Sequence, residues 1–483
     1  TNHPPRAQLN KFKYSTTYEI FSADSSGTVS ASRQARAFFV FVFLSIFYAV
    51  VALVCCIIEP GAAGSGIPEV KAYLNGVNLN KIVRVRILPF KLIGMCFSCA
   101  AGLPLGKEGP MIHCGSVVGA AMSQGKTFTF GYDTSWTKFQ DLRNDAGKRD
   151  FVTFGAAAGV AAAFSAPIGG ILFTLEEGAS FWSTTLTFRA FFCAMCAELI
   201  INLLTSGLTT VGGGVYGEDL GSNDENSMFP FGTFSQDVNY HTYELVLFII
   251  LGIFGGLLGA IFNAINMRLS IFRSKFINQQ RWKRALEVIV FSGGFASLCF
   301  LLPLIFGQCS VLPPQMASST SLTPTTDLTN ELVQWTCPTG YHNELASLFM
   351  VDSNISMQQL FHLPLGTFTT LPLFIFFMPY FLLAAMTSGI LVPAGLFVPT
   401  LTSGAAFGRI FGHGLNAAFP GQVSSSGSYA LLGAAAILGG MSRMTIAGTV
   451  IVLEACGNSQ YLLPLMLVFA ASRYTGNAIN QPM

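Results

Sequence analysis

Charged side chains are scarce in this sequence. Of its 483 residues, only 10% are Asp, Glu, Lys or Arg, while 51% are hydrophobic. Soluble domains carry about 25% charged residues. A chain with so few charges cannot cover itself with water-compatible groups, which excludes a soluble globular protein and predicts an integral membrane protein. The formal net charge of +2 gives no reason to expect a nucleic-acid partner.

Other absences narrow the class further. The polar, basic stretch 1–36 lacks the apolar h-region of a signal peptide, and the positive-inside rule predicts that it is cytoplasmic. The same rule predicts a cytoplasmic location for the basic stretch 71–91, which carries Lys71, Lys81, Arg84, Arg86 and Lys91. Two CxxC pairs, Cys96–Cys99 and Cys193–Cys196, lie in apolar runs without an accompanying His or second pair. The sequence therefore predicts no metal site and no cofactor.

A polar region interrupts the apolar chain near its middle. Cys309 and Cys337 lie there, and so does Asn354 in the only glycosylation sequon, "NIS". If this loop (about 307–365) is non-cytoplasmic, a disulfide between the two cysteines is expected. We assign 37–483 to one transmembrane domain, with halves at about 37–207 and 243–483.

The chain repeats itself. Residues 154–177, "FGAAAGVAAAFSAPIGGILFTLEE", align without gaps on 432–455, and 106–119 align on 395–408. Small residues recur by chance in membrane helices. Two blocks in the same order and at similar spacing nevertheless favour an internal repeat. Paired broken segments in two halves point to a transporter's binding site.

Three glycine-proline pieces carry the expected chemistry: "GSGIPE" (64–69), "GKEGP" (106–110) and "GLFVP" (395–399). Each is typical of the unwound start of a half-helix, because glycine allows close approach and proline suits the first turn. Free N–H groups and positive dipole ends would then form an anion site inside the membrane. The Ser65 hydroxyl could add a further donor to this site.

Glu108 lies within the second piece. A carboxylate at the bilayer centre is costly, but Glu108 could occupy the anion site as a tethered anion. It would compete with the mobile anion, take a proton and swing away, and so act as both gate and proton carrier. The alternative is an ion pair with the adjacent Lys107 at a water interface.

The three pieces, in this order, resemble the signature motifs of the CLC family of chloride channels and chloride/proton exchangers. "GGLLGAIFNAIN" (255–266) and both "GAAA" blocks extend the resemblance over essentially the whole chain. It implies an all-α polytopic fold of about eighteen helices, many broken or tilted, in two inverted-topology repeats. It also implies a homodimer with one pore per subunit, with chloride bound by Ser65 and by the N–H groups of Leu396 and Phe397. The full chloride-binding set that we expect on this basis adds Gly66, Ile67, Lys107 and Gly109. Glu108 would be the gating glutamate, and Lys107 would make the outer entrance electropositive.

The family includes exchangers and passive channels. Exchangers resemble one another in an inner proton-transfer glutamate, which Glu177 of "LEEGASFW" matches. The resemblance therefore favours a chloride/proton exchanger, with a passive voltage-gated chloride channel as the alternative. Glu177 could instead cap a helix or form a surface pair. Ser65 matches the chloride-preferring pattern, and the wording around Glu177 is most similar to the endosomal and lysosomal branch, which favours an intracellular or vacuolar membrane over the plasma membrane.

Two family features are not found in the sequence. The pore tyrosine would fall just past Met483, since Tyr474 comes too early, and the CBS regulatory domains would follow it. The sequence does not indicate whether an accessory subunit binds.

Two other classes of protein explain less. An intramembrane serine hydrolase would use Ser65 with His113 or His413, which requires a Ser–His contact and an oxyanion hole. A non-transporting membrane scaffold would not explain why charged residues lie inside the membrane. We therefore do not expect an enzyme. Glu198 and Glu454 are expected to be structural or interfacial, Glu454 aligns with Glu176, and Glu69 suits the start of a half-helix.

Overall fold

The structure is a computed structural model of the whole chain. The parts described are residues 5–22, 31–77, 82–123, 128–129, 132–133, 144–178, 180, 182–210, 231, 234, 240–312, 328, 331–338 and 340–480. Lys81, part of the basic stretch 71–91, lies outside them.

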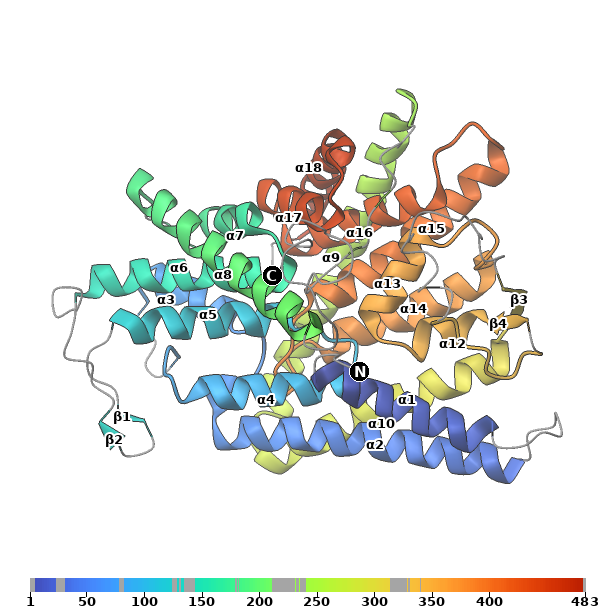
Figure 1. Cartoon of the computed structure of the whole chain (residues 1–483), viewed down its shortest axis with the longest axis horizontal. Coiled ribbons are helices and arrows are strands. Elements are labelled where there is room, and N and C mark those ends of the chain that lie inside the picture. Colours follow the sequence, from blue (N-terminus) through green and yellow to red (C-terminus); the bar gives the residue numbers. More distant parts are fainter. Residues whose placement is uncertain are drawn as a thin grey trace.

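Helices make up most of the described chain (Figure 1). Seventeen α-helices are described, close to the expected number. The helices of the first half are α1 (Pro5–Ser22), α2 (Ala31–Ile58), α3 (Ile67–Leu74), α4 (Ile87–Ala100), α5 (Glu108–Ser123), α6 (Asp145–Phe164), α7 (Pro167–Phe173) and α8 (Thr184–Thr210). Those of the second half are α9 (Glu244–Phe276), α10 (Arg281–Phe306), α12 (Glu344–Phe349), α13 (Ser353–His362), α14 (Thr370–Thr387), α15 (Phe397–Ala418), α16 (Ser426–Ser442), α17 (Ile446–Cys456) and α18 (Leu462–Ile479).

Short elements fill some of the connections. They are the 3-10 turns Pro60–Ala62 and Ser459–Tyr461, the π-helical turn Thr174–Gly178, and two hairpins, β1 (Phe128–Thr129) with β2 (Tyr132–Asp133) and β3 (Cys309–Val311) with β4 (Tyr341–Asn343).

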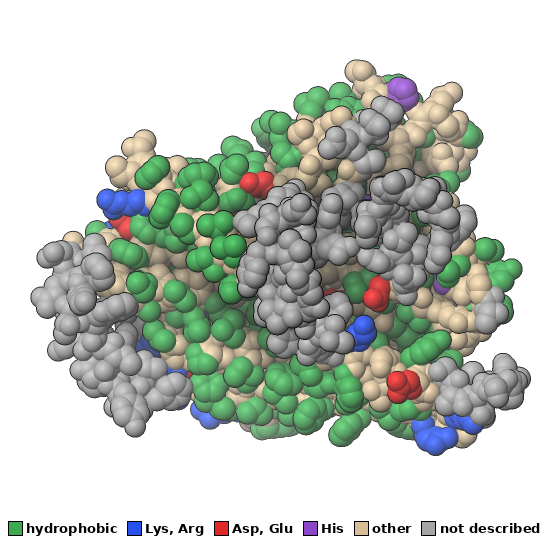
Figure 2. All heavy atoms as spheres, in the orientation of Figure 1, with side chains coloured by type: hydrophobic (Ala, Val, Ile, Leu, Met, Phe, Trp, Pro, Cys, Tyr) green, Lys and Arg blue, Asp and Glu red, His purple; other side chains and the backbone are tan. Residues whose placement is uncertain are grey.

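Five of the described helices are long and apolar enough to cross a membrane: Ser32–Ile58, Thr184–Leu204, Glu244–Phe276, Arg281–Phe306 and Thr370–Thr387. Large apolar side chains such as Phe39, Phe43 and Phe188 project outward from them. Figure 2 shows a face on which most coloured side chains are hydrophobic and few are charged. This surface suits contact with lipid, as expected from the composition.

The internal repeat is confirmed as a structural one. Helices α5, α6 and α7 of the first half correspond in order to α15, α16 and α17 of the second, and α5 packs along α6 as α15 packs along α16. In Figure 1 helices α5, α6 and α7 lie on the left, α15 lies on the right, and α17 lies near the centre of the view, where it contacts α7. The break within each repeat also recurs, because Ser165 and Arg443 occupy equivalent positions and both have positive φ.

Glycine brings the paired helices of each repeat together. A Cβ on Gly115 would overlap the backbone of Gly155, and one on Gly404 would overlap that of Gly433. These are equivalent pairs in the two repeats. In each case the absence of a side chain lets one backbone lie directly against the other.

The N-terminal segment 1–36 includes a helix that packs on the rest of the protein. Residues 5–22 form α1, which packs against α2 and α4, and α2 already begins at Ala31. Lys13 is fully buried and donates hydrogen bonds to the carbonyls of Ala100 and Ala101 at the end of α4. These two carbonyl oxygens accept hydrogen bonds from the Lys13 ammonium group in place of water molecules.

The polar region 307–365 was predicted as a loop, and this is wrong for its second part. Residues 344–349 and 353–362 form α12 and α13, and most of their side chains are buried. The predicted disulfide between Cys309 and Cys337 is present and joins β3 to the segment before β4. Asn354 lies in the first turn of α13 and is half-buried.

Candidate functional site

Each of the three glycine-proline pieces ends in a helix start, as predicted. Helix α3 begins at Ile67, after Gly66 in the left-handed conformation (φ 79°), and α5 begins at Glu108. Helix α15 begins at Phe397. Each start leaves backbone N–H groups without partners inside its own helix, and these groups form the positive end of the helix dipole.

The three helix starts meet at one junction. Gly106 N–H donates to the Gly395 carbonyl at 2.7 Å, and Gly395 N–H donates back to Gly106 at 2.9 Å. The piece at 64–69 joins them, because Gly64 N–H donates to Val392 and Gly109 lies directly against Ser65. Gly106 and Gly395 are equivalent in the repeat, so the junction lies where the two halves face each other.

Glu108 places a carboxylate at this junction. The residue is fully buried, and its Oε2 folds back over Gly106, where a Cβ would overlap it. Glycine at 106 is therefore needed for this side-chain position. Because helix N-termini favour negative charge, the junction offsets part of the cost of burying a carboxylate.

The predicted chloride-binding residues surround the same point. The Ser65 hydroxyl accepts the Ile67 N–H at 3.4 Å, so it lies at the start of α3. Phe397 is buried, and its ring packs edge-on against Phe164 and Phe173 at centroid distances of 5.3 and 6.4 Å. The result is a small polar junction with an aromatic wall.

Lys107 directly precedes Glu108 and is buried, with 8% of the residue exposed. Its contribution to an electropositive outer entrance stays a prediction.

His113 lies directly against Gly66 and contacts Lys91 of the basic stretch 71–91. Its Nδ1 is 2.7 Å from Nζ of the fully buried Lys91, and its Nε2 donates to the Ile82 carbonyl at 3.1 Å. Both ring nitrogens are thus used away from the Ser65 hydroxyl. This arrangement argues against a Ser65–His113 catalytic pair.

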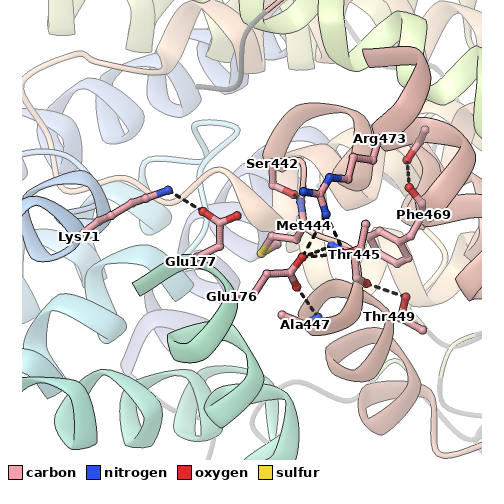
Figure 3. A network of polar contacts seen from close by, with 11 residues as sticks. Lys71, Glu176, Glu177, Ser442, Met444, Thr445, Ala447, Thr449, Phe469 and Arg473 are labelled. Carbon is pink, nitrogen blue, oxygen red and sulfur yellow. Dashed lines mark hydrogen bonds and ion pairs between the residues drawn. The ribbon is translucent and has the colours of Figure 1, made fainter. Parts of the chain in front are cut away.

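The inner carboxylates lie in the π-helical turn after α7 (Figure 3). Glu177 forms an ion pair with Lys71 of α3 at 2.8 Å, with side chains 24% and 48% exposed, respectively. The same eight-residue helix therefore begins at the anion junction and later contacts Glu177. Lys71 was identified in the sequence only as a basic residue, because nothing in the local pattern indicates a contact so distant along the chain.

Metal chemistry has no support among the residues described. They include no group of three His, Cys, Asp or Glu side chains that could hold a metal ion. Among the described residues, the cysteines of the two CxxC pairs form no disulfide bonds.

The chain is similar to one family of proteins over most of its length. The family model described as "Voltage gated chloride channel" matches residues 46–477. The human "H(+)/Cl(-) exchange transporter 7" is 40% identical over 89% of this chain and 51% of its own length. "Chloride channel protein C" of Dictyostelium discoideum is 37% identical over 98% of this chain and 59% of its own length. The chain thus spans about half the length of the curated relatives that it matches.

Solved structures share the fold. A eukaryotic CLC transporter matches with a TM-score of 0.65 at 20% identity, covering 99% of this chain and 69% of that one. A slow cyanobacterial Cl⁻/H⁺ antiporter matches with a TM-score of 0.63 at 18% identity, covering 99% and 96%. The fold of two inverted repeats is therefore the one predicted.

Proposed function

The chain belongs to the voltage-gated chloride channel family, and on that premise we propose that it exchanges chloride for protons across a membrane. The observation that carries this proposal is the position of the Glu108 carboxylate, buried where α3, α5 and α15 begin. A negative group held by three helix N-termini occupies a place that a chloride ion could take.

The gating step follows from this position. Protonation makes the Glu108 carboxylate neutral, which removes its attraction to the helix ends. The side chain then leaves the junction, and chloride takes its place near Ser65, Gly66, Ile67, Gly109, Leu396 and Phe397. Return of the carboxylate as an anion expels chloride and releases the proton. One residue thereby couples the two ions.

Glu177 favours an exchanger over a passive channel. Its carboxylate lies at a partly exposed position, from which it can receive protons from water and pass them toward Glu108. The relatives of mouse and human named H(+)/Cl(-) exchange transporter 7 also support this assignment. Relatives named as chloride channels keep the channel as the alternative.

Reconstitution into liposomes tests the proposal. Internal pH is recorded while an imposed chloride gradient discharges, with E177A as the matched variant. We expect uphill proton movement driven by chloride in the parent protein and none in E177A. Chloride flux without proton movement in the parent protein would instead assign a passive channel.

We further propose that the protein acts as a homodimeric transporter and not as an enzyme. The apolar, outward-facing residues Ile168 and Ile446 lie at equivalent positions of the two repeats and offer a surface for a second copy. Mass measurement of the purified protein in detergent tests this, because a monomeric mass would contradict it. A location in an endosomal, lysosomal or vacuolar membrane is tested by imaging a tagged full-length chain.

A further inference from the structure

The two repeats hold each other through a pair of reciprocal carboxylate contacts. Glu176, in the turn after α7, accepts hydrogen bonds from the backbone N–H groups of Thr445 and Ala447, both at 2.8 Å (Figure 3). Glu454, near the end of α17, accepts from the N–H groups of Ile168 and Gly169 at 3.2 and 2.8 Å. Each carboxylate therefore binds the first turn of a helix in the other repeat.

These contacts are equivalent under the repeat. Glu176 aligns with Glu454, and Gly169 aligns with Ala447, so the two 2.8 Å bonds match each other. Carboxylates that accept backbone N–H bonds at a helix start form charge-assisted hydrogen bonds, which are short and strong. We call the pair of contacts the carboxylate clasp.

The clasp differs between the repeats in two ways. Glu176 is followed by Glu177, whereas Glu454 is followed by Ala455 within a regular helix. Glu176 also accepts from the Thr445 hydroxyl at 2.7 Å and lies 3.7 Å from Arg473 of α18. The half of the clasp beside the inner proton glutamate thus has the larger set of contacts.

We propose that Glu176 is a positioning residue for Glu177, an inference that rests on the proposed exchange function. Its bonds to the start of α17 fix the π-helical turn Thr174–Gly178. The fixed turn directs the Glu177 carboxylate toward Lys71 and the water beyond it. Proton delivery in the first repeat therefore depends on a helix of the second.

The contacts of Glu177 show why such a support is needed. Its ion pair with Lys71 is partly exposed, and exposed pairs hold a side chain only weakly. A π-helical turn is rare and occurs mostly at functional sites. The part-buried hydrogen bonds from the N–H groups of Thr445 and Ala447 fix the turn one residue before Glu177.

The test compares E176Q with E454Q in the full chain, reconstituted in liposomes. Gln at either position places an amide N–H₂ group against backbone donors, so each variant breaks one half of the clasp in the same way. We expect E176Q to lower the number of protons moved per chloride at least threefold, while chloride flux stays within twofold. E454Q should leave this ratio at the value of the parent protein.

A milder variant, T445V, covers the case in which E176Q does not fold. It removes the hydroxyl donor to Glu176 and leaves every carboxylate in place, so we expect a smaller loss of coupling in the same direction. Monodisperse elution in detergent shows that each variant is folded. An unchanged coupling ratio in folded E176Q or T445V overturns the positioning role. A parent protein without proton coupling overturns the exchange function itself.

Discussion

At the scale of single residues, Glu108 makes the most direct prediction. E108Q removes the charge and the titration that link the ions, so we expect proton movement to fall at least tenfold while chloride still crosses. Simultaneous chloride and pH recordings in liposomes measure both. E69Q is the control, because Glu69 is exposed in the first turn of α3 and has no place at the junction. Full proton coupling in E108Q would show that this carboxylate is not the carrier.

Lys71 gives a second prediction at this scale. K71Q removes the charge that contacts Glu177, so we expect proton flux to fall about threefold to tenfold, while K71R keeps most of it. The pair is partly exposed and contributes at most about 1 kcal/mol to the free energy of unfolding. The thermal midpoint should therefore change little in K71Q. A large loss of stability with unchanged proton flux would contradict a functional role.

The residues of the site differ in how well the sequence predicts them. Ser65, Glu108 and Phe397 lie at local breaks made by glycine and proline, so short-range patterns identify them. Lys71 and Glu176 act through contacts with residues far along the chain, which depend on tertiary packing. The repeat was the one signal for Glu176, since it placed Glu454 at the equivalent position.

At the scale of elements, the glycine contacts between paired helices determine stability. G155A forces a methyl group into the backbone of α5, so we expect a loss of about 1–3 kcal/mol in the free energy of unfolding. Thermal unfolding in detergent measures this. G294A is the control, because a Cβ at Gly294 of α10 meets nothing within 4 Å. Equal midpoints for the two variants would argue against the close packing of α5 on α6.

The sequence predicts a helix best where an apolar run begins directly after a glycine-proline break. The starts of α3, α5 and α15 follow from their sequences. Helices α12 and α13 were missed because their polar residues are satisfied inside the protein: Glu344, for example, accepts from the Thr369 N–H at 2.6 Å and from its hydroxyl at 3.0 Å. A composition-based prediction cannot distinguish such buried polar groups from a solvated loop.

At the scale of the whole molecule, the disulfide between Cys309 and Cys337 closes a long loop with a sequence separation of 28 residues. Removing a crosslink of this kind costs about 2–4 kcal/mol, chiefly by freeing the unfolded chain. We expect reductant to lower the thermal midpoint of the parent protein and to have no effect on the double variant C309S/C337S. An equal effect of reductant on both proteins would mean that this bond does not stabilise the fold.

The bridge between Gly106 and Gly395 has a consequence for how this protein can change over generations. Both hydrogen bonds of the bridge join backbone atoms of equivalent turns. A substitution that shifts the backbone of one turn therefore also shifts the turn bonded to it. A second substitution within the same half does not restore the hydrogen bonds between the two turns. We therefore expect the two turns, although far apart in the gene, to covary during evolution.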